Sequence, residues 1–133
     1  MPDSSKVALL LVTDELIRKG LELLLRDMGI TVISAGSISE LDHRLSLITA
    51  PPNLLLFQLI TSDNSPAIYL VRKLRKRFNH CTPTILLDNE SAMHELLFTD
   101  KYLKILPDQI KPAVLREKII ESITCPDKEI HLN

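Results

Sequence analysis

Short apolar runs alternate with longer amphipathic stretches along the chain. Each run is five to eight residues long and rich in Leu, Ile and Val, which is typical of strands buried on both faces of a parallel sheet. A polar or turn-forming cluster follows each run and predicts where the strand ends. The predicted strands are Val7–Val12, Ile30–Ala35, Asn53–Ile60, Pro83–Leu87 and Tyr102–Leu106.

Helical periodicity fills the intervals between these runs. From Asp14 to Met28, apolar residues recur every three or four positions, with charged residues on the other side. Asp14 or Thr13 can cap the start of this helix, and Gly29 can end it. The other predicted helices run from a Ser37–Glu40 capping box to Ile48, from Pro66 to Phe78, from Ser91 to Phe98, and from Pro112 to Ile123 with Val114, Leu115, Ile119 and Ile123 as its inner face.

Five strand–helix units in this order predict an α/β fold. Connections of this length between parallel strands are right-handed crossovers, which place helices on both faces of the sheet. We therefore expect a doubly wound, flavodoxin-like sandwich around a five-stranded parallel sheet. The predicted domain covers residues 1–125, and residues 126–133 are predicted to be a linker or a disordered tail.

Composition narrows the class of protein. The chain has 133 residues and a formal net charge of -1, so it can bury a core without metals or disulfides and has no overall field that attracts nucleic acid. Cys81 and Cys125 have no metal-ligand spacing, which favours incidental reduced thiols. Because no signal-peptide pattern is present and the run Val7–Val12 is too short to cross a bilayer, we expect a soluble, cytoplasmic protein with no membrane contact.

Polar residues follow the predicted strands at one edge of the sheet. In open α/β sheets, ligands and chemistry collect at the carboxyl ends of the strands. Thr13 and Asp14 follow the first strand, Gln58 stands near the end of the otherwise apolar run NLLLFQLI, and Asp88 follows the fourth strand. Gln58 can serve a ligand, or it can simply hydrogen-bond the backbone or Asp88 at a strand end.

A dense group of cations lies in the sequence LVRKLRKRF of the third predicted helix. Such a patch can contact nucleic acid, but cations near a helix C-terminus also complement the helix dipole and keep an amphipathic helix soluble. The second interpretation is the simpler one. The residues are Arg72, Lys73, Arg75, Lys76 and Arg77.

From about Lys6 to Ile123, the chain resembles the receiver domains of bacterial two-component response regulators. The resemblance lies in the order of the five units and in the stretches LLLVTDELIRKGLELLL, MGITVISAGS, NLLLFQLI and PTILL. The phrase IRKGLELLL is most similar to receivers that precede a helix-turn-helix DNA-binding domain. The resemblance implies a regulatory and dimerisation module that acts on a partner or on an attached effector.

The positions that carry receiver chemistry are changed in this sequence. The resemblance implies that the phosphorylated aspartate corresponds to Gln58, whose neutral amide is a poor nucleophile. The acidic pair that helps to hold Mg²⁺ corresponds to Thr13 and Asp14, the hydroxyl residue after the fourth strand to Asp88, and the lysine after the fifth strand to Asp108, with Lys104 as a second choice. Two added negative charges would repel a phosphoryl group.

The sequence therefore predicts a degenerate pseudo-receiver that works without phosphorylation, without a cofactor and without a bound metal. Its expected partner is a second copy or another regulator. Contact with DNA is expected only through a domain beyond Asn133. Leu21 and Leu25 in the first helix and Val114 and Ile120 in the last are candidates for a dimer face, although core packing can also account for them.

Three alternatives are also compatible with the sequence. A sensor domain could bind a small polar or cationic molecule at the carboxyl edge through Gln58, Asp88, Asp14 and Asp108. An active receiver could use a displaced acceptor, Asp63 or Asp14. An enzyme is disfavoured because His43, His80, His94 and His131 are scattered and match no nucleophile motif.

Overall fold

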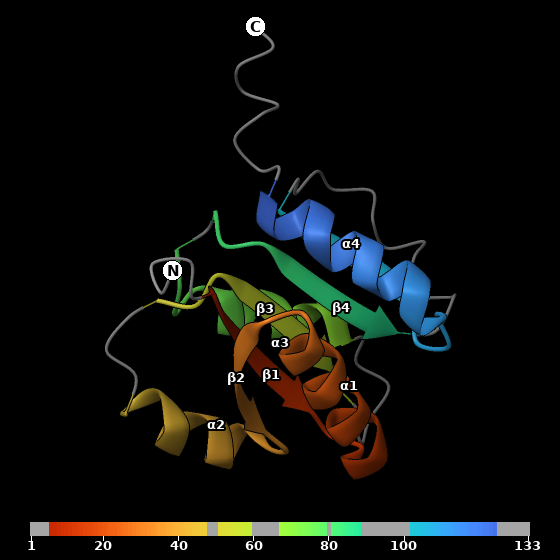
Figure 1. The fold of residues 1–133 in the computed structure, drawn as a ribbon. Helices are drawn as coiled ribbons and strands as arrows, with labels where there is room; N and C mark the ends of the chain where they lie inside the picture. The colour runs from red at the N-terminus through yellow and green to blue at the C-terminus, as the bar shows by residue number, and fades with distance from the viewer. Residues whose placement is uncertain (1–5, 48–50, 60–66, 80, 89–101, 125–133) are drawn as a thin grey trace, which may run out of the picture.

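A five-stranded parallel sheet forms the centre of the molecule, with the strand order β2-β1-β3-β4-β5 (Figure 1). The computed structural model describes residues 6–47, 51–59, 67–79, 81–88 and 102–124. Each strand pairs in parallel with its neighbours. The strands are β1 (Lys6–Val12), β2 (Ile30–Ala35), β3 (Leu54–Gln58), β4 (Thr84–Asp88) and β5 (Leu103–Pro107).

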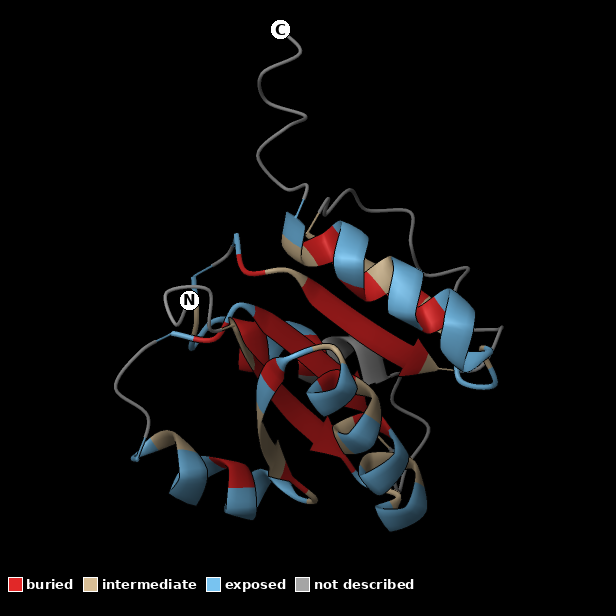
Figure 2. Ribbon diagram, in the orientation of Figure 1, coloured by how far each residue is buried: buried red, intermediate tan, exposed pale blue. Residues whose placement is uncertain are grey.

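Helices cover both faces of this sheet, and the sheet separates the core into two layers (Figure 2). The described helices are α1 (Glu15–Asp27), α2 (Ile38–Leu45), α3 (Ala67–Arg75) and α4 (Pro112–Thr124). α1 and α4 pack on one face, and α2 and α3 pack on the other. All five residues of β3 are buried, as the apolar run predicts for a central strand. The predicted doubly wound sandwich is confirmed.

The ends of α1 follow the sequence signals. The N-cap is Asp14, whose Oδ1 accepts a hydrogen bond from the backbone N–H of Ile17 at 3.0 Å. Gly29 follows the helix with a φ of 81°, a left-handed conformation in which a side chain would be strained. The polar cap and the glycine thus fix α1 between β1 and β2.

The capping box of α2 has a modified bonding pattern. Ser37 is the N-cap, and its Oγ accepts from the backbone N–H of Glu40 at 3.1 Å. The Glu40 carboxylate reaches back to the N–H of Gly36, at 2.9 Å, rather than to that of Ser37. That hydrogen bond lowers the pKa of the Glu40 carboxyl; burial opposes the shift, and Arg44 and Arg18 assist it.

Several predicted boundaries shift by one to three residues. β4 and β5 begin and end one residue later than predicted, and α3 ends at Arg75, although Phe78 still packs against the core. In α4, Leu115 and Ile119 are buried as predicted, but Val114 is exposed. Its assignment to the inner face was wrong, because Val114 lies on a different side of the helix from Leu115. The predicted helix from Ser91 to Phe98 and both chain ends lie outside the described residues.

None of the helices in the described ranges is long and apolar enough to span a bilayer.

Candidate functional site at the carboxyl edge of the sheet

The candidate residues meet at the carboxyl edge of the sheet. In the strand register, Val12 pairs with Gln58, and Asp88 pairs with Pro107. Thr13 and Asp14 follow β1 directly, and Asp108 follows β5 directly. Four adjacent strands therefore bring the five positions, predicted from distant parts of the sequence, to one edge of the sheet.

Gln58 is tied to the start of α1. Its side chain is 9% exposed, and its Oε1 accepts a hydrogen bond from the backbone N–H of Asp14 at 3.3 Å. Its main-chain carbonyl accepts from the N–H of Thr13 at 2.9 Å. The interpretation in which the Gln58 amide bonds the backbone at a strand end agrees with these contacts. The amide holds the β1–α1 turn against β3.

Asp14 uses its carboxylate to support α1. Its Oδ1 accepts the Ile17 N–H, which satisfies one of the free donors in the first turn. Its backbone N–H is the one that bonds Gln58. The Asp14 carboxylate therefore serves as the N-cap of α1.

The other half of the edge carries two aspartates. The backbone N–H of Asp108 donates to the carbonyl of Asp88 at 2.9 Å, which joins the two residues through the main chain. The side chain of Asp108 is exposed and that of Asp88 is half-buried. Lys104 lies in the body of β5, where its Nζ is 3.5 Å from Glu121 of α4. Asp108, not Lys104, therefore follows the end of β5.

Two of the oxygens at this edge that could bind Mg²⁺ already accept hydrogen bonds from the backbone. Magnesium requires near-octahedral oxygen ligands, usually with one or two carboxylates. In the described ranges, no three His, Cys, Asp or Glu side chains are grouped closely enough to hold a metal ion. The Asp14 carboxylate caps α1, and the Gln58 oxygen already accepts a backbone N–H.

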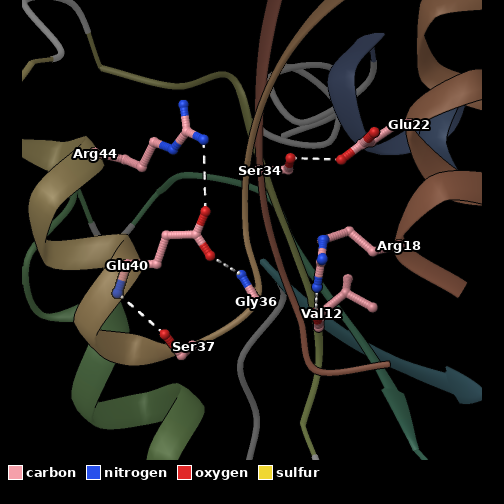
Figure 3. Close-up of polar contacts among 8 residues, drawn as sticks. All are labelled: Val12, Arg18, Glu22, Ser34, Gly36, Ser37, Glu40 and Arg44. Atoms are coloured by element: carbon pink, nitrogen blue, oxygen red, sulfur yellow. Dashed lines mark hydrogen bonds and ion pairs between the residues drawn. The ribbon is translucent and has the colours of Figure 1, made fainter. Parts of the chain in front are cut away.

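Arg18 of α1 contributes to this edge, although helical periodicity places it among the charged residues opposite the apolar positions of the helix. Its Nη1 donates to the carbonyl of Val12, the last residue of β1, at 2.9 Å (Figure 3). A Cβ at Gly36 would lie 2.5 Å from the same nitrogen, so glycine leaves the space that the guanidinium fills. The spacing in the sequence could have indicated this contact. Arg18 lies one turn beyond the cap Asp14, and its long side chain can reach back to the end of β1.

A second contact fixes α1 against β2. The Oγ of Ser34 donates to Oε2 of Glu22 at 2.5 Å, as Figure 3 shows. Together with Arg18, this bond attaches α1 to the β1–β2 half of the sheet through side chains as well as through the core.

The four residues predicted for a dimer face separate into two groups. Leu21 and Leu25 are only 7% and 0% exposed, so core packing accounts for both and they are not available on the surface. Val114 and Ile120 are exposed, but on different sides of α4. Ile120 lies one turn beyond Arg116, whose guanidinium bonds Asp27 of α1. It therefore lies on the side of α1.

Val114 faces the other way. It shares a side of α4 with Lys118 and Glu121 at helical spacing. Glu121 contacts Lys104 of β5, so this side of the helix lies toward the edge strand. The four residues do not form one surface.

The basic group at the end of α3 is only partly a surface patch. Arg75 is 8% exposed and belongs to the interior, whereas Arg72, Lys73 and Lys76 are exposed. Arg77 forms an ion pair with Asp42 of α2. His43 and Cys81 are exposed; the other histidines and Cys125 lie outside the described residues.

Comparison of the whole structure with solved structures gives consistent matches. A response regulator receiver domain protein from Methanospirillum hungatei JF-1 is similar with a TM-score of 0.71 at 23% identity, over 95% of this chain and 99% of that chain. A receiver domain protein from Clostridium thermocellum gives a TM-score of 0.72 at 16% identity, over 96% and 99%. The chain has the receiver-domain fold.

A longer protein also contains a similar domain. NtrX from Brucella abortus matches with a TM-score of 0.74 at 12% identity, over 95% of this chain and 28% of that chain. No protein-family model matches the sequence, and comparison with curated proteins finds no significant match. With identities below 25%, these similarities establish the receiver-domain fold and not its chemistry, which depends on the residues at the sheet edge.

Proposed function

We propose that this chain is an atypical receiver domain that regulates through protein contacts and does not use phosphorylation. The main support for this proposal is the position of Gln58 and the hydrogen bond of its side chain. Gln58 ends β3 at the position matched to the phosphorylated aspartate, and its amide oxygen accepts the Asp14 N–H. An amide oxygen is a poor nucleophile toward phosphorus, so this position lacks a group that can accept the phosphoryl.

Electrostatics at the same edge support the proposal. A phosphoryl group brings about two negative charges. Asp88 ends β4, at the position matched to a hydroxyl residue of receivers. Asp108 follows β5, at the position matched to a lysine. Two carboxylates would repel the anion where receivers supply a neutral donor and a cation.

The proposed role is that of a regulatory and dimerisation module in the cytoplasm. The match to a part of NtrX supports a place within a longer regulator, and in that arrangement a linked domain would make the contact with DNA. Catalysis is not part of the proposal, because the edge presents helix-capping and backbone-bonded side chains instead of a nucleophile with a base.

The first test is a two-dimensional amide NMR titration of the chain with Mg²⁺ and then with beryllofluoride, which mimics a phosphoryl group on a carboxylate. We expect the amides of Thr13, Asp14, Gln58 and Asp88 to keep their positions in both titrations. Shifts of these amides at low Mg²⁺ concentration, followed by further shifts with beryllofluoride, would contradict the proposal.

A second test restores the acceptor. In Gln58→Asp, labelling by acetyl phosphate should remain absent, because Asp88 and Asp108 still repel the incoming anion. The matched variant Gln58→Asp/Asp88→Thr/Asp108→Lys removes that repulsion and should label more than the single variant, as measured by intact-mass spectrometry. Efficient labelling of Gln58→Asp alone would show that the two aspartates do not block the reaction.

A further inference from the structure

The outward side of α1 carries two leucines that the fold does not bury. Leu16 is 82% exposed and Leu23 is 67% exposed. They are seven residues apart, which places them two turns apart on one side of the helix, about 10 Å along the axis. Figure 2 shows the exposed residues of α1 in pale blue on the side away from the sheet. These leucines contribute nothing to the core.

Gly20 lies between the two leucines on the same side of α1. Glycine in the middle of a helix is unfavourable relative to alanine. Its φ is not positive, and a Cβ added there would meet no atom within 4 Å. Within one molecule neither backbone conformation nor space requires glycine at this position. A close approach by another backbone is a physical reason for it.

Charges on the flank of this surface are arranged in a self-complementary way. Glu15 is the first residue of α1 and Arg26 lies in its last turn, and both side chains are exposed. They lie on the same flank of the helix, about 16 Å apart along the axis. Lys19 lies between them, and its Nζ is 3.7 Å from the Glu15 carboxylate, so the charged flank consists of these three residues. If two copies of α1 pack antiparallel, Glu15 of each copy meets Arg26 of the other. The leucine pair and the charged pair are both centred on Gly20.

We propose that a second copy of this chain docks on α1, with the two α1 helices antiparallel and crossing at Gly20. Leu16 of each copy then packs near Leu23 of the other, and two Glu15–Arg26 pairs close the contact. The occupant is a second copy because the surface is complementary to itself when reversed about Gly20, as a two-fold interface requires. The inference rests on the proposed regulatory function and names the surface through which the domain pairs.

The leucine contact is tested by sedimentation-velocity ultracentrifugation of the whole chain over a range of concentrations. The wild-type chain should dimerise. Leu23→Glu should raise the dissociation constant at least about tenfold, because the contact would then bury an unpaired charge. Leu47→Glu is the matched control, because Leu47 is 68% exposed but follows α2. It should dimerise like the wild-type chain.

Two results would overturn this proposal. A wild-type chain that stays monomeric up to about 1 mM, where even weak pairs form, has no such contact. Equal loss of dimer in Leu23→Glu and Leu47→Glu would show that an added charge acts without regard to position.

The direction of packing is tested by charge reversal. In Glu15→Lys and in Arg26→Glu, each homodimer places like charges opposite one another, and association should weaken. An equimolar mixture of the two variants forms attractive pairs at both ends and should associate as the wild-type chain does. A mixture that associates no better than either variant alone would exclude the antiparallel arrangement. A parallel pair would already place Glu15 opposite Glu15 and Arg26 opposite Arg26 in the wild-type chain, so neither single variant would weaken association relative to wild type.

Failure of this inference is separable from failure of the proposed function. The ultracentrifugation experiments contain no Mg²⁺ or phosphoryl donor, so a monomeric chain would leave the NMR result at Gln58 unchanged. Conversely, the chain could bind beryllofluoride and still form the Gly20-centred dimer. That result would support the proposed interface and contradict the proposed independence from phosphorylation.

Discussion

The inner and outer sides of α1 carry the same residue type and have opposite roles. Leu21 and Leu25 are buried against the sheet, whereas Leu16 and Leu23 are largely exposed. The sequence pattern suggested the first pair as candidates for a dimer face, and the structure leaves the second pair on the surface. What separates the pairs is the direction in which each leucine leaves the helix. An apolar residue indicates an interface only after the core has been assigned.

The largest effect should come from the inner side. Leu25→Ala should lower the free energy of unfolding by about 2 to 5 kcal/mol, because it removes a fully buried side chain and leaves a cavity. Urea denaturation measures the change. The matched variant Leu23→Ala should change the free energy of unfolding of the monomer by no more than about 0.5 kcal/mol. Similar losses in the two variants would remove the distinction between the two sides.

An intermediate effect with two opposite signs is expected at Gly20. Gly20→Ala should raise the free energy of unfolding of the monomer by up to about 1 kcal/mol, because alanine is the better helix former and its methyl group has open space. The same methyl groups would meet at the crossing point of the proposed dimer and weaken association. Thermal unfolding of the diluted chain and sedimentation of the concentrated chain measure the two effects.

An increase in both monomer stability and dimer affinity in Gly20→Ala would separate Gly20 from the interface. It would leave the contact between Leu16 and Leu23 to be tested by their own variants.

The smallest effect concerns an exposed contact on α2 and sets the scale for what a helix surface contributes. Folding lowers the pKa of Glu40 through the Gly36 N–H bond. Its contribution is therefore fully present above the unfolded-state pKa of about 4.3 and is lost as the pH falls through the lower folded-state value. Glu40→Gln should be slightly less stable at neutral pH, and its difference from wild type should shrink on acidification.

Urea denaturation at about pH 7 and about pH 3 checks this expectation. A stability difference that stays constant between the two pH values would show that the Glu40 carboxylate does not carry the effect.

The fold was predictable because its signals are local. Five apolar runs, the Asp14 cap, Gly29 and the Ser37 cap each determine an element boundary through nearby residues, and the structure agrees with them. Parallel strands then bring their carboxyl ends together, so the meeting of Gln58 and Asp108 at one edge also followed from the pattern. The Gln58 bond to the Asp14 backbone agreed with one of two interpretations of that residue.

The remaining features depend on side-chain reach in three dimensions. The apolar positions assigned to α1 span about half of its circumference, so periodicity could not show that Leu16 points outward. Arg18 turns back to Val12, against the simple rule that a cation on a helix faces solvent. The assignment of Val114 to the inner face was wrong for a similar reason, since apolar residues occur on more than one side of α4 and do not form a single stripe.

The chemistry of the Gln58 amide has a consequence for the proposed regulatory role. A primary amide neither ionises in the ordinary pH range nor accepts a phosphoryl group, so its bond to Asp14 is the same whatever the supply of phosphodonors in the cell. If the chain pairs through α1 as proposed, the number of pairs depends on the concentration of the chain. At low concentration it would rise with the square of that concentration.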